Sequence, residues 1–127
     1  MKISSALILP FIAILAFSSC ANKQVALKTY SKNILFKSKK IKFYDTSFVT
    51  IYQDHIHLEV FNSANLVLTL KIFKDKICRD NFRCTSSKEF NKEYFGANYP
   101  TSFLYDIFLQ QKASFKDKQR NIIIKIF

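Results

Sequence analysis

The chain has very little glycine and proline, with one glycine and two prolines in 127 residues. A glycine-rich loop that cradles phosphate is therefore excluded, and so is a hairpin that turns on two glycines. We expect hairpin turns to use Asn, Asp and Ser, which also tolerate turn conformations. Acidic residues are scarce too, 9 against 20 lysines and arginines, giving a formal net charge of +11.

No hydrophobic run is long enough to span a bilayer as a permanent helix. The longest run, residues 3–17, has 15 residues and contains Pro10, whereas a spanning helix needs about 20 residues. It follows a short positive start at Met1-Lys2 and precedes the small residues Ser18-Ser19-Cys20-Ala21. This order of charge, apolar run and small residues predicts a secretory signal peptide.

The segment Phe17-Ser18-Ser19-Cys20 resembles the lipobox of bacterial lipoproteins. That resemblance implies that residues 1–19 are removed, and that the Cys20 thiol carries a diacyl anchor containing palmitate. Because Ala21, not Asp, follows the cysteine, the resemblance also implies sorting to the outer membrane, with the domain facing the periplasm. An ordinary secreted protein, cut after Ser18 or Ala21, stays open as the alternative.

The mature chain is large enough for one domain and too small for two. Removing residues 1–19 leaves 108 residues and takes away one basic residue, Lys2, and no acidic residue, so the net charge becomes +10. We expect residues 20–32 to form the lipidated cysteine and a basic tether, and residues 33–127 to form a single β-rich periplasmic domain. Because the chain is exported, nucleic acid is not expected as a partner.

Two cysteines remain after the anchor is assigned to Cys20. Cys78 and Cys84 are an even pair in a compartment where disulfides persist, and Asp80-Asn81 between them favour a turn. A structural disulfide between opposing arms of a small hairpin is the favoured interpretation, ahead of two free thiols or a redox pair.

A basic segment follows the anchor, with no acidic residue between the cysteine and Asp45. Such a segment beside a lipid anchor can lie against anionic headgroups, worth about 1 kcal/mol per lysine near the surface. Alternatively, these lysines only solvate a linker and a strand edge. The segment contains Lys23, Lys28, Lys32, Lys37, Lys39, Lys40 and Lys42.

Period-two alternation dominates the middle of the chain and predicts an antiparallel meander. The strands are expected at residues 33–37, 41–44, 48–52, 55–60 and 66–73, with Leu66, Leu68, Leu70 and Ile72 on one face. A capping box at Ser86–Glu89 predicts a helix that ends at Gly96. A second helix is expected at 102–111, and residues 121–127 form a final strand that returns to the sheet. The predicted fold class is therefore α+β, mainly antiparallel β: a curved meander or incomplete barrel packed by two short helices.

No residue pattern indicates catalysis, a cofactor or a metal. His55 and His57 share one face of a strand and could bind zinc together with the two later cysteines, but a solvated polar face beside a disulfide is the favoured interpretation. No serine or cysteine has the context of a nucleophile.

The order of elements, with a lid-like segment from Tyr99-Pro100 to Phe108, resembles the LolA/LolB-like lipoprotein carrier fold. That resemblance implies a non-enzymatic binding or assembly module for acyl-bearing or anionic envelope components. The alternative is a structural lipoprotein without a cavity, which docks on an acidic envelope protein. An apolar cavity between sheet and helices would favour the first function, and a filled core with an exposed apolar patch would favour the second.

Overall fold

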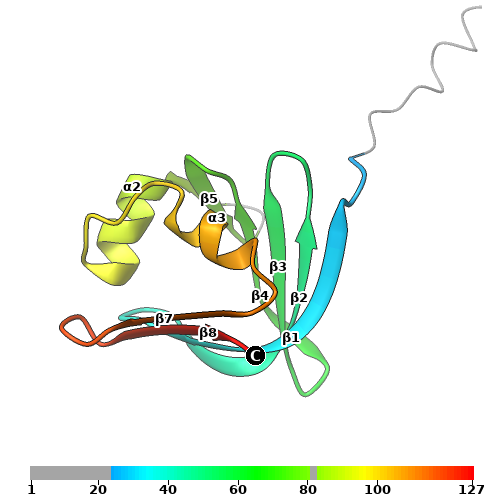
Figure 1. The fold of residues 1–127 in the computed structure, drawn as a ribbon, viewed down its shortest axis with the longest axis horizontal. Helices are drawn as coiled ribbons and strands as arrows, with labels where there is room; N and C mark the ends of the chain where they lie inside the picture. The colour runs from blue at the N-terminus through cyan, green and yellow to red at the C-terminus, as the bar shows by residue number, and fades with distance from the viewer. Residues whose placement is uncertain (1–23, 81–82) are drawn as a thin grey trace, which may run out of the picture.

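A computed structural model describes residues 24–80 and 83–127 (Figure 1). The predicted signal peptide, Cys20 and Lys23 lie outside the described residues. All eight strands of the described part join one antiparallel sheet in the order β6-β5-β4-β3-β2-β1-β8-β7. The strands are β1 (Lys28–Lys37), β2 (Lys42–Ile51), β3 (Ile56–Asn62), β4 (Asn65–Ile72), β5 (Lys76–Arg79), β6 (Arg83–Ser86), β7 (Ala113–Asp117) and β8 (Ile122–Ile126).

The sheet is open and strongly curved, and its helices lie on the concave side (Figure 1). These helices are α2 (Ser87–Phe90), which continues as the π-helical turn η1 (Asn91–Phe95), and α3 (Phe103–Phe108). The predicted fold class, a mainly antiparallel curved sheet with two short helices and a strand at the C-terminus, is confirmed.

Alternating burial shows which side chains face the helices. In β3, Ile56, Leu58 and Val60 are fully buried, whereas His57 and Glu59 between them are half-buried. Their register partners continue the same two rows across the sheet. Each strand therefore has an inner face toward the core and an outer face on the convex side of the sheet.

The β3–β4 hairpin turns on Asn62-Ser63-Ala64-Asn65, between the strands predicted at 55–60 and 66–73, with positive φ at Ser63 (48°) and Ala64 (67°). A β-bulge between Val60 and Phe61 shifts the register. Leu68 therefore pairs with the buried Val60, while Leu66 pairs with Phe61 and is 50% exposed. The prediction that Leu66 shares a face with the other leucines of this strand is wrong, because the bulge inserts one residue and reverses the alternation.

The first two strands are longer than predicted. β1 begins at Lys28, so residues 28–32 of the expected tether pair with β2, and Tyr30 is buried. β2 runs unbroken through Asp45–Ser47, which lie between the strands predicted at 41–44 and 48–52. Asp45, Thr46 and Ser47 are all polar, so the sequence shows no alternation of apolar and polar residues there. The strand β7 was not predicted; it is an edge strand in which every residue is exposed or only partly buried.

Both predicted helices are present, the second shorter than expected. Ser86 accepts a hydrogen bond from the backbone N–H of Glu89 at 3.1 Å, as a capping residue does. Gly96 ends the first helix with φ of 65°, a conformation that favours glycine. The end of α3 is held against the sheet by the Tyr30 hydroxyl, which donates to the carbonyl of Phe108 at 2.8 Å.

Aromatic and aliphatic side chains fill the space between helices and sheet. Phe36 from the sheet and Phe90, Phe95 and Phe108 from the helices are all at most 2% exposed. The Phe95 ring lies 6.0 Å from Phe36. An apolar cavity that spans this layer, as the carrier fold would require, is therefore replaced in the described residues by a packed core.

Candidate functional site

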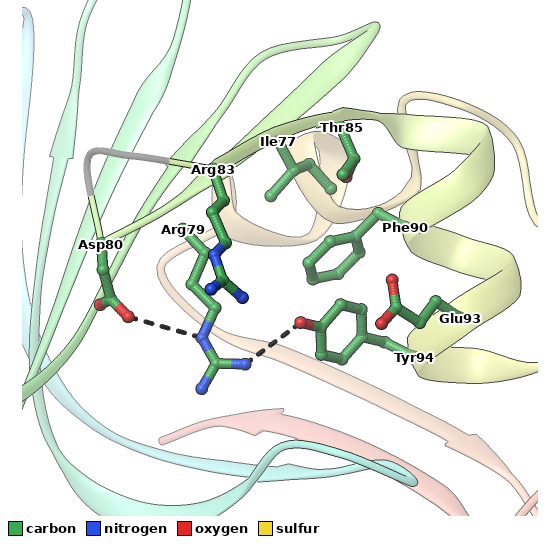
Figure 2. A pocket seen from close by; sticks show the side chains of 8 residues that line it. All are labelled: Ile77, Arg79, Asp80, Arg83, Thr85, Phe90, Glu93 and Tyr94. Carbon is green, nitrogen blue, oxygen red and sulfur yellow. Dashed lines mark hydrogen bonds and ion pairs between the residues drawn. The ribbon is translucent and has the colours of Figure 1, made fainter.

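A pocket of about 650 Å³ opens at one end of the concave side, between the β5–β6 hairpin and the first helix (Figure 2). Arginine and aromatic side chains meet in it, and its wall combines polar and apolar groups. It is lined by Ile77, Arg79, Asp80, Arg83, Thr85, Phe90, Glu93 and Tyr94.

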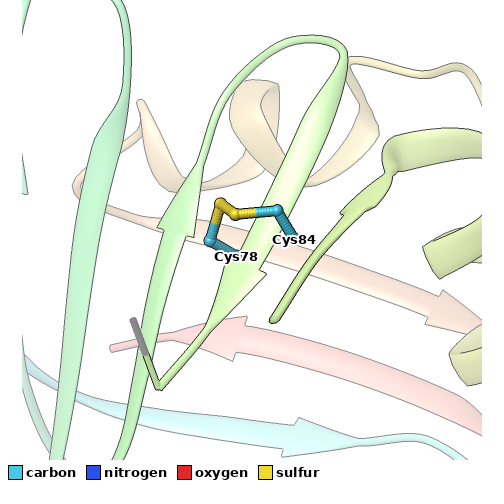
Figure 3. Close-up of a disulfide and its surroundings, with 2 residues drawn as sticks. All are labelled: Cys78 and Cys84. Carbon is cyan, nitrogen blue, oxygen red and sulfur yellow. A yellow bond between two sulfur atoms is a disulfide. The ribbon is translucent and has the colours of Figure 1, made fainter. Parts of the chain in front are cut away.

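The disulfide fixes the hairpin that carries the two arginines (Figure 3). Cys78 and Cys84 are direct register partners on β5 and β6, with Cα atoms 3.9 Å apart. The predicted disulfide between opposing hairpin arms is confirmed. Because Cys78 and its partner Lys71 lie on the outer face, the next pair, Arg79 and Arg83, lies on the inner face and reaches the pocket.

Two arginines directly opposite each other repel, and like charges at such a position destabilise a sheet. Arg79 is partly compensated: its Nη1 donates to the Tyr94 hydroxyl at 3.1 Å, and its Nε lies 3.6 Å from Asp80 Oδ2. Within residues 24–80 and 83–127, Arg83 forms no ion pair. Among the described residues, the Arg83 guanidinium has no side-chain partner, so its N–H donors are available to a ligand.

The acidic residues at the pocket do not cancel its positive charge. Glu93 accepts a bond from Lys40 Nζ at 2.7 Å, and Asp80 pairs with Arg79. Counting Lys40, three cations meet two carboxylates. The pocket therefore offers a net positive charge and guanidinium donors, which suit a carboxylate or phosphate.

One wall of the pocket is apolar. Ile77 and Phe90 are each 2% exposed, and the Phe90 and Tyr94 rings stack with centroids 4.2 Å apart. An anion with a short apolar portion would contact both surfaces. The lining residues provide donors and apolar contact, with no serine, cysteine or histidine among them.

The predicted basic segment does not form one continuous surface. Lys28 and Lys32 lie on inner-face positions of β1, whereas Lys37 and Lys42 pair on the outer face at its far end. Lys39 and Lys40 lie in the turn between β1 and β2, and Lys40 is paired with Glu93. A membrane role for the whole segment stays a prediction, and the structure separates these lysines onto different sides of the sheet.

The favoured interpretation of a solvated polar face at the two histidines is wrong, because His55 is 5% exposed and His57 is half-buried. The His55 ring stacks between Tyr52 and Phe73, at centroid distances of 4.7 and 4.9 Å, and its Nδ1 lies 2.7 Å from Asp54 Oδ1. That bond holds the pKa of Asp54 below its usual value. Burial lowers the pKa of His57. The cysteine sulfurs are bonded to each other, so they cannot complete the zinc set considered above.

Tyr99 and Asp117 form a second pair of residues with shifted pKa values, and this pair lies away from the pocket. The Tyr99 hydroxyl donates to Asp117 Oδ2 at 2.5 Å. This bond lowers the pKa of Asp117, while burial raises the pKa of Tyr99 to about 12. Because the Tyr99 ring also packs on Phe103 and Phe115, the pair ties the helical layer to β7.

Sequence reasoning did not single out Arg79, Arg83 or Tyr94. The available signal was the position of each arginine immediately beside a cysteine, on the ascending and descending arms of one hairpin. The side of the sheet on which the two arginines lie depends on how β5 pairs with β6. An expected turn at Asp80-Asn81 does not determine that pairing.

No family model, curated protein or solved structure matches this chain. In the described part of the chain, no helix is both long and apolar enough to cross a membrane.

Proposed function

We propose that this chain is a lipid-anchored lipoprotein of the outer membrane, facing the periplasm, and that it binds an anionic envelope component without catalysing a reaction. The observation that carries the binding role is the Arg79–Arg83 pair across β5 and β6, held in register by the disulfide and open to a pocket. A bound anion would relieve the repulsion between the two guanidinium groups.

The ligand class follows from the two surfaces of the pocket. A phosphate or carboxylate suits the arginines, and a short apolar portion suits Ile77, Phe90 and the Tyr94 ring. The proposed ligand is therefore an amphiphile with an anionic headgroup. Its acyl chains would stay largely outside the domain, since the core between sheet and helices is packed.

Calorimetric titration of the purified full chain with octyl phosphate tests this proposal. We expect Arg83→Gln to weaken binding about tenfold or more, because a hydrogen bond to a charged group is worth about 1.5–3 kcal/mol. Arg120→Gln is the matched control, since Arg120 lies in the β7–β8 turn and pairs with Asp117. Equal affinity of both variants for octyl phosphate would contradict the proposal.

Two further probes define the headgroup and the tail. Octanol lacks the charge and should not bind, whereas inorganic phosphate should bind more weakly than octyl phosphate because it lacks the apolar contact. If octanol bound as well as octyl phosphate, the pocket would be an apolar site and the role of the arginines would be wrong.

The anchor rests on the lipobox-like segment and is tested separately. Mass spectrometry of the protein extracted from membranes should show a chain that begins at Cys20 and carries acyl chains on that residue. Cys20→Ala should remove the lipid mass and leave the signal peptide uncleaved. A Cys20→Ala protein processed like the unchanged chain would contradict lipidation.

The alternative, a docking lipoprotein without a ligand cavity, is supported by different residues. The helical layer is packed, and large apolar side chains are exposed on the convex side of the sheet, including Tyr44 (57%) and Leu66 (50%). On this alternative, the basic domain would meet an acidic envelope protein.

A further inference from the structure

The outer face of the sheet carries a group of aromatic and aliphatic side chains, of which all but the partly buried Phe61 are exposed. Register partners place the strand residues among them on the side opposite the helices, and Phe127 contacts Tyr44 there. We name this group the convex patch. It consists of Tyr44, Phe48, Phe61, Leu66 and Phe127.

The convex patch is made of two clusters, and side chains contact each other within each cluster. Phe48 and Phe61 meet edge to face with centroids 5.4 Å apart, and Leu66 is the register partner of Phe61. The second cluster joins Tyr44 to Phe127 at 5.6 Å. Thr46, the register partner of Phe61, lies between Tyr44 and Phe48 on β2 and connects the clusters.

Lysines flank the Tyr44–Phe127 end of the convex patch, while Glu59 is the register partner of Phe48 at its other end. Lys125 Nζ lies 4.7 Å from the centroid of the Phe127 ring, and Lys42 is two residues from Tyr44 on the same face of β2. Among the described strand residues, Glu59 is the only acidic residue at an outer-face position. The lysines at such positions are Lys37, Lys42, Lys71, Lys76, Lys116 and Lys125.

We propose that the convex patch is a membrane contact, which inserts its aromatic side chains among the headgroups of an anionic bilayer while the flanking lysines pair with the lipid charge. Aromatic rings with lysines beside them match the chemistry of that interface. A second copy of this chain fits less well, because a symmetric contact would bring the same lysines together.

The course of the chain would keep the domain, and with it the convex patch, close to the bilayer. The predicted anchor at Cys20 precedes β1, and Leu27, which is 67% exposed, is held beside the sheet by a bond from its backbone N–H to the carbonyl of Ile51. The eight-residue segment 20–27 can reach no further than about 3.5 Å per residue, so an anchored domain stays within reach of the bilayer. The inference uses the proposed anchor in this step alone.

Single tryptophan reporters test the proposal, because the chain has no tryptophan of its own. Phe48→Trp reports the convex patch, and Leu109→Trp is the matched control on the helical side, with exposures of 41% and 40% at the two native positions. The full chain is bound to equimolar phosphatidylethanolamine–phosphatidylglycerol vesicles with brominated acyl chains. We expect bromine to quench Phe48→Trp emission, with a shift to shorter wavelength, and to leave Leu109→Trp unchanged.

The charge requirement is tested with a paired lysine variant. Lys42→Gln with Lys125→Gln should weaken vesicle partitioning about 30-fold, from about fivefold for each lysine near an anionic surface. Lys88→Gln with Lys92→Gln, both exposed on the first helix, is the control. Replacing phosphatidylglycerol by phosphatidylcholine should weaken partitioning at least as much as the convex-side variant, because it removes the lipid charge for all the flanking lysines.

Two results would overturn the proposal. The first is equal or absent quenching at both positions, with Tyr44→Trp as a second reporter to exclude a local folding defect. The second is a blue shift of Phe48→Trp that depends on protein concentration and needs no lipid, which would assign the patch to a second copy. Either result leaves octyl phosphate binding to the Arg79–Arg83 pocket unaffected, so the two proposals fail separately.

Discussion

At the scale of single residues, the scarcity of glycine leaves strain in the β3–β4 turn. Ser63 and Ala64 both have positive φ, at 48° and 67°, although a Cβ atom disfavours this conformation by about 1–2 kcal/mol. The single glycine of the chain lies elsewhere, at position 96. The pairing of β3 with β4 therefore stabilises the hairpin and holds the two turn residues in this unfavourable conformation.

Replacing Ala64 by glycine should stabilise the protein. Relief of the positive φ exceeds the added chain entropy of the unfolded state, so we expect a gain of about 0.5–1 kcal/mol in the free energy of unfolding. Urea denaturation measures the change. Ala113→Gly is the control: this alanine lies in β7 without a positive φ, and its replacement should destabilise. A loss of stability in Ala64→Gly would contradict the assigned turn conformation.

His57 should make stability depend on pH. Burial lowers its pKa in the folded chain below the ordinary 6.5, with nearby Lys71 and His55 acting in the same direction and Glu59 opposing them. Between the lowered pKa and 6.5 the unfolded chain binds more protons than the folded chain, so stability falls as the pH drops below about 6.5.

Denaturation midpoints measured from pH 7.5 to pH 5 check this effect. The unchanged chain should lose stability toward the acidic end, and His57→Gln should have a flatter profile in that window. The pKa values of Asp54 and Asp117 are also lowered. The stability that these two carboxylates contribute is lost only below their ordinary pKa of 3.8, which lies outside the measured window of pH 7.5 to 5. An identical slope in His57→Gln would contradict the role of His57.

At the scale of elements, the β5–β6 hairpin links stability to the pocket. Each strand has only four residues, and the disulfide joins them at the pair next to the two arginines. So short a hairpin has few ladder hydrogen bonds of its own. Its register, and with it the position of both guanidinium groups, therefore depends on the covalent bond.

Removing the disulfide with Cys78→Ala and Cys84→Ala should therefore have two effects. The free energy of unfolding should fall by about 2 kcal/mol, the value expected for closing such a small loop. The affinity for octyl phosphate should fall as well, because the arginines are no longer held together. Urea denaturation and calorimetry measure the two effects. Unchanged affinity in a folded double variant would mean that the hairpin register does not depend on the disulfide.

Elements with regular alternation could be predicted, and those with local irregularities could not. Residues 55–60 alternate clearly, so β3 was located, as were Gly96 and the hairpin cysteines. The bulge at Val60/Phe61 leaves no mark in the sequence, so the face of Leu66 was assigned wrongly. β7 contains Phe115 as its one large apolar residue, too weak a pattern for a strand. Predicting that Arg79 and Arg83 share a pocket requires the register between β5 and β6, which the sequence does not give.

At the scale of the whole molecule, the curved sheet separates two surfaces with different chemistry. Its concave side holds the helices and ends in the arginine pocket, and its convex side presents aromatic residues among lysines. If the convex patch contacts a bilayer, as we propose, the pocket would lie on the side away from that contact. Such an arrangement would leave the pocket open to a ligand presented from the periplasm.

The arginine side chains allow the most direct test of ligand binding, because the chain has only three, Arg79, Arg83 and Arg120. Nitrogen-15 NMR of their Nε–H groups during titration with octyl phosphate reports each guanidinium separately. We predict that the signals of Arg79 and Arg83 shift together and saturate at one affinity, while the Arg120 signal stays in place. Shifts of equal size at all three arginines, or none at Arg83, would contradict the pocket as the anion-binding site.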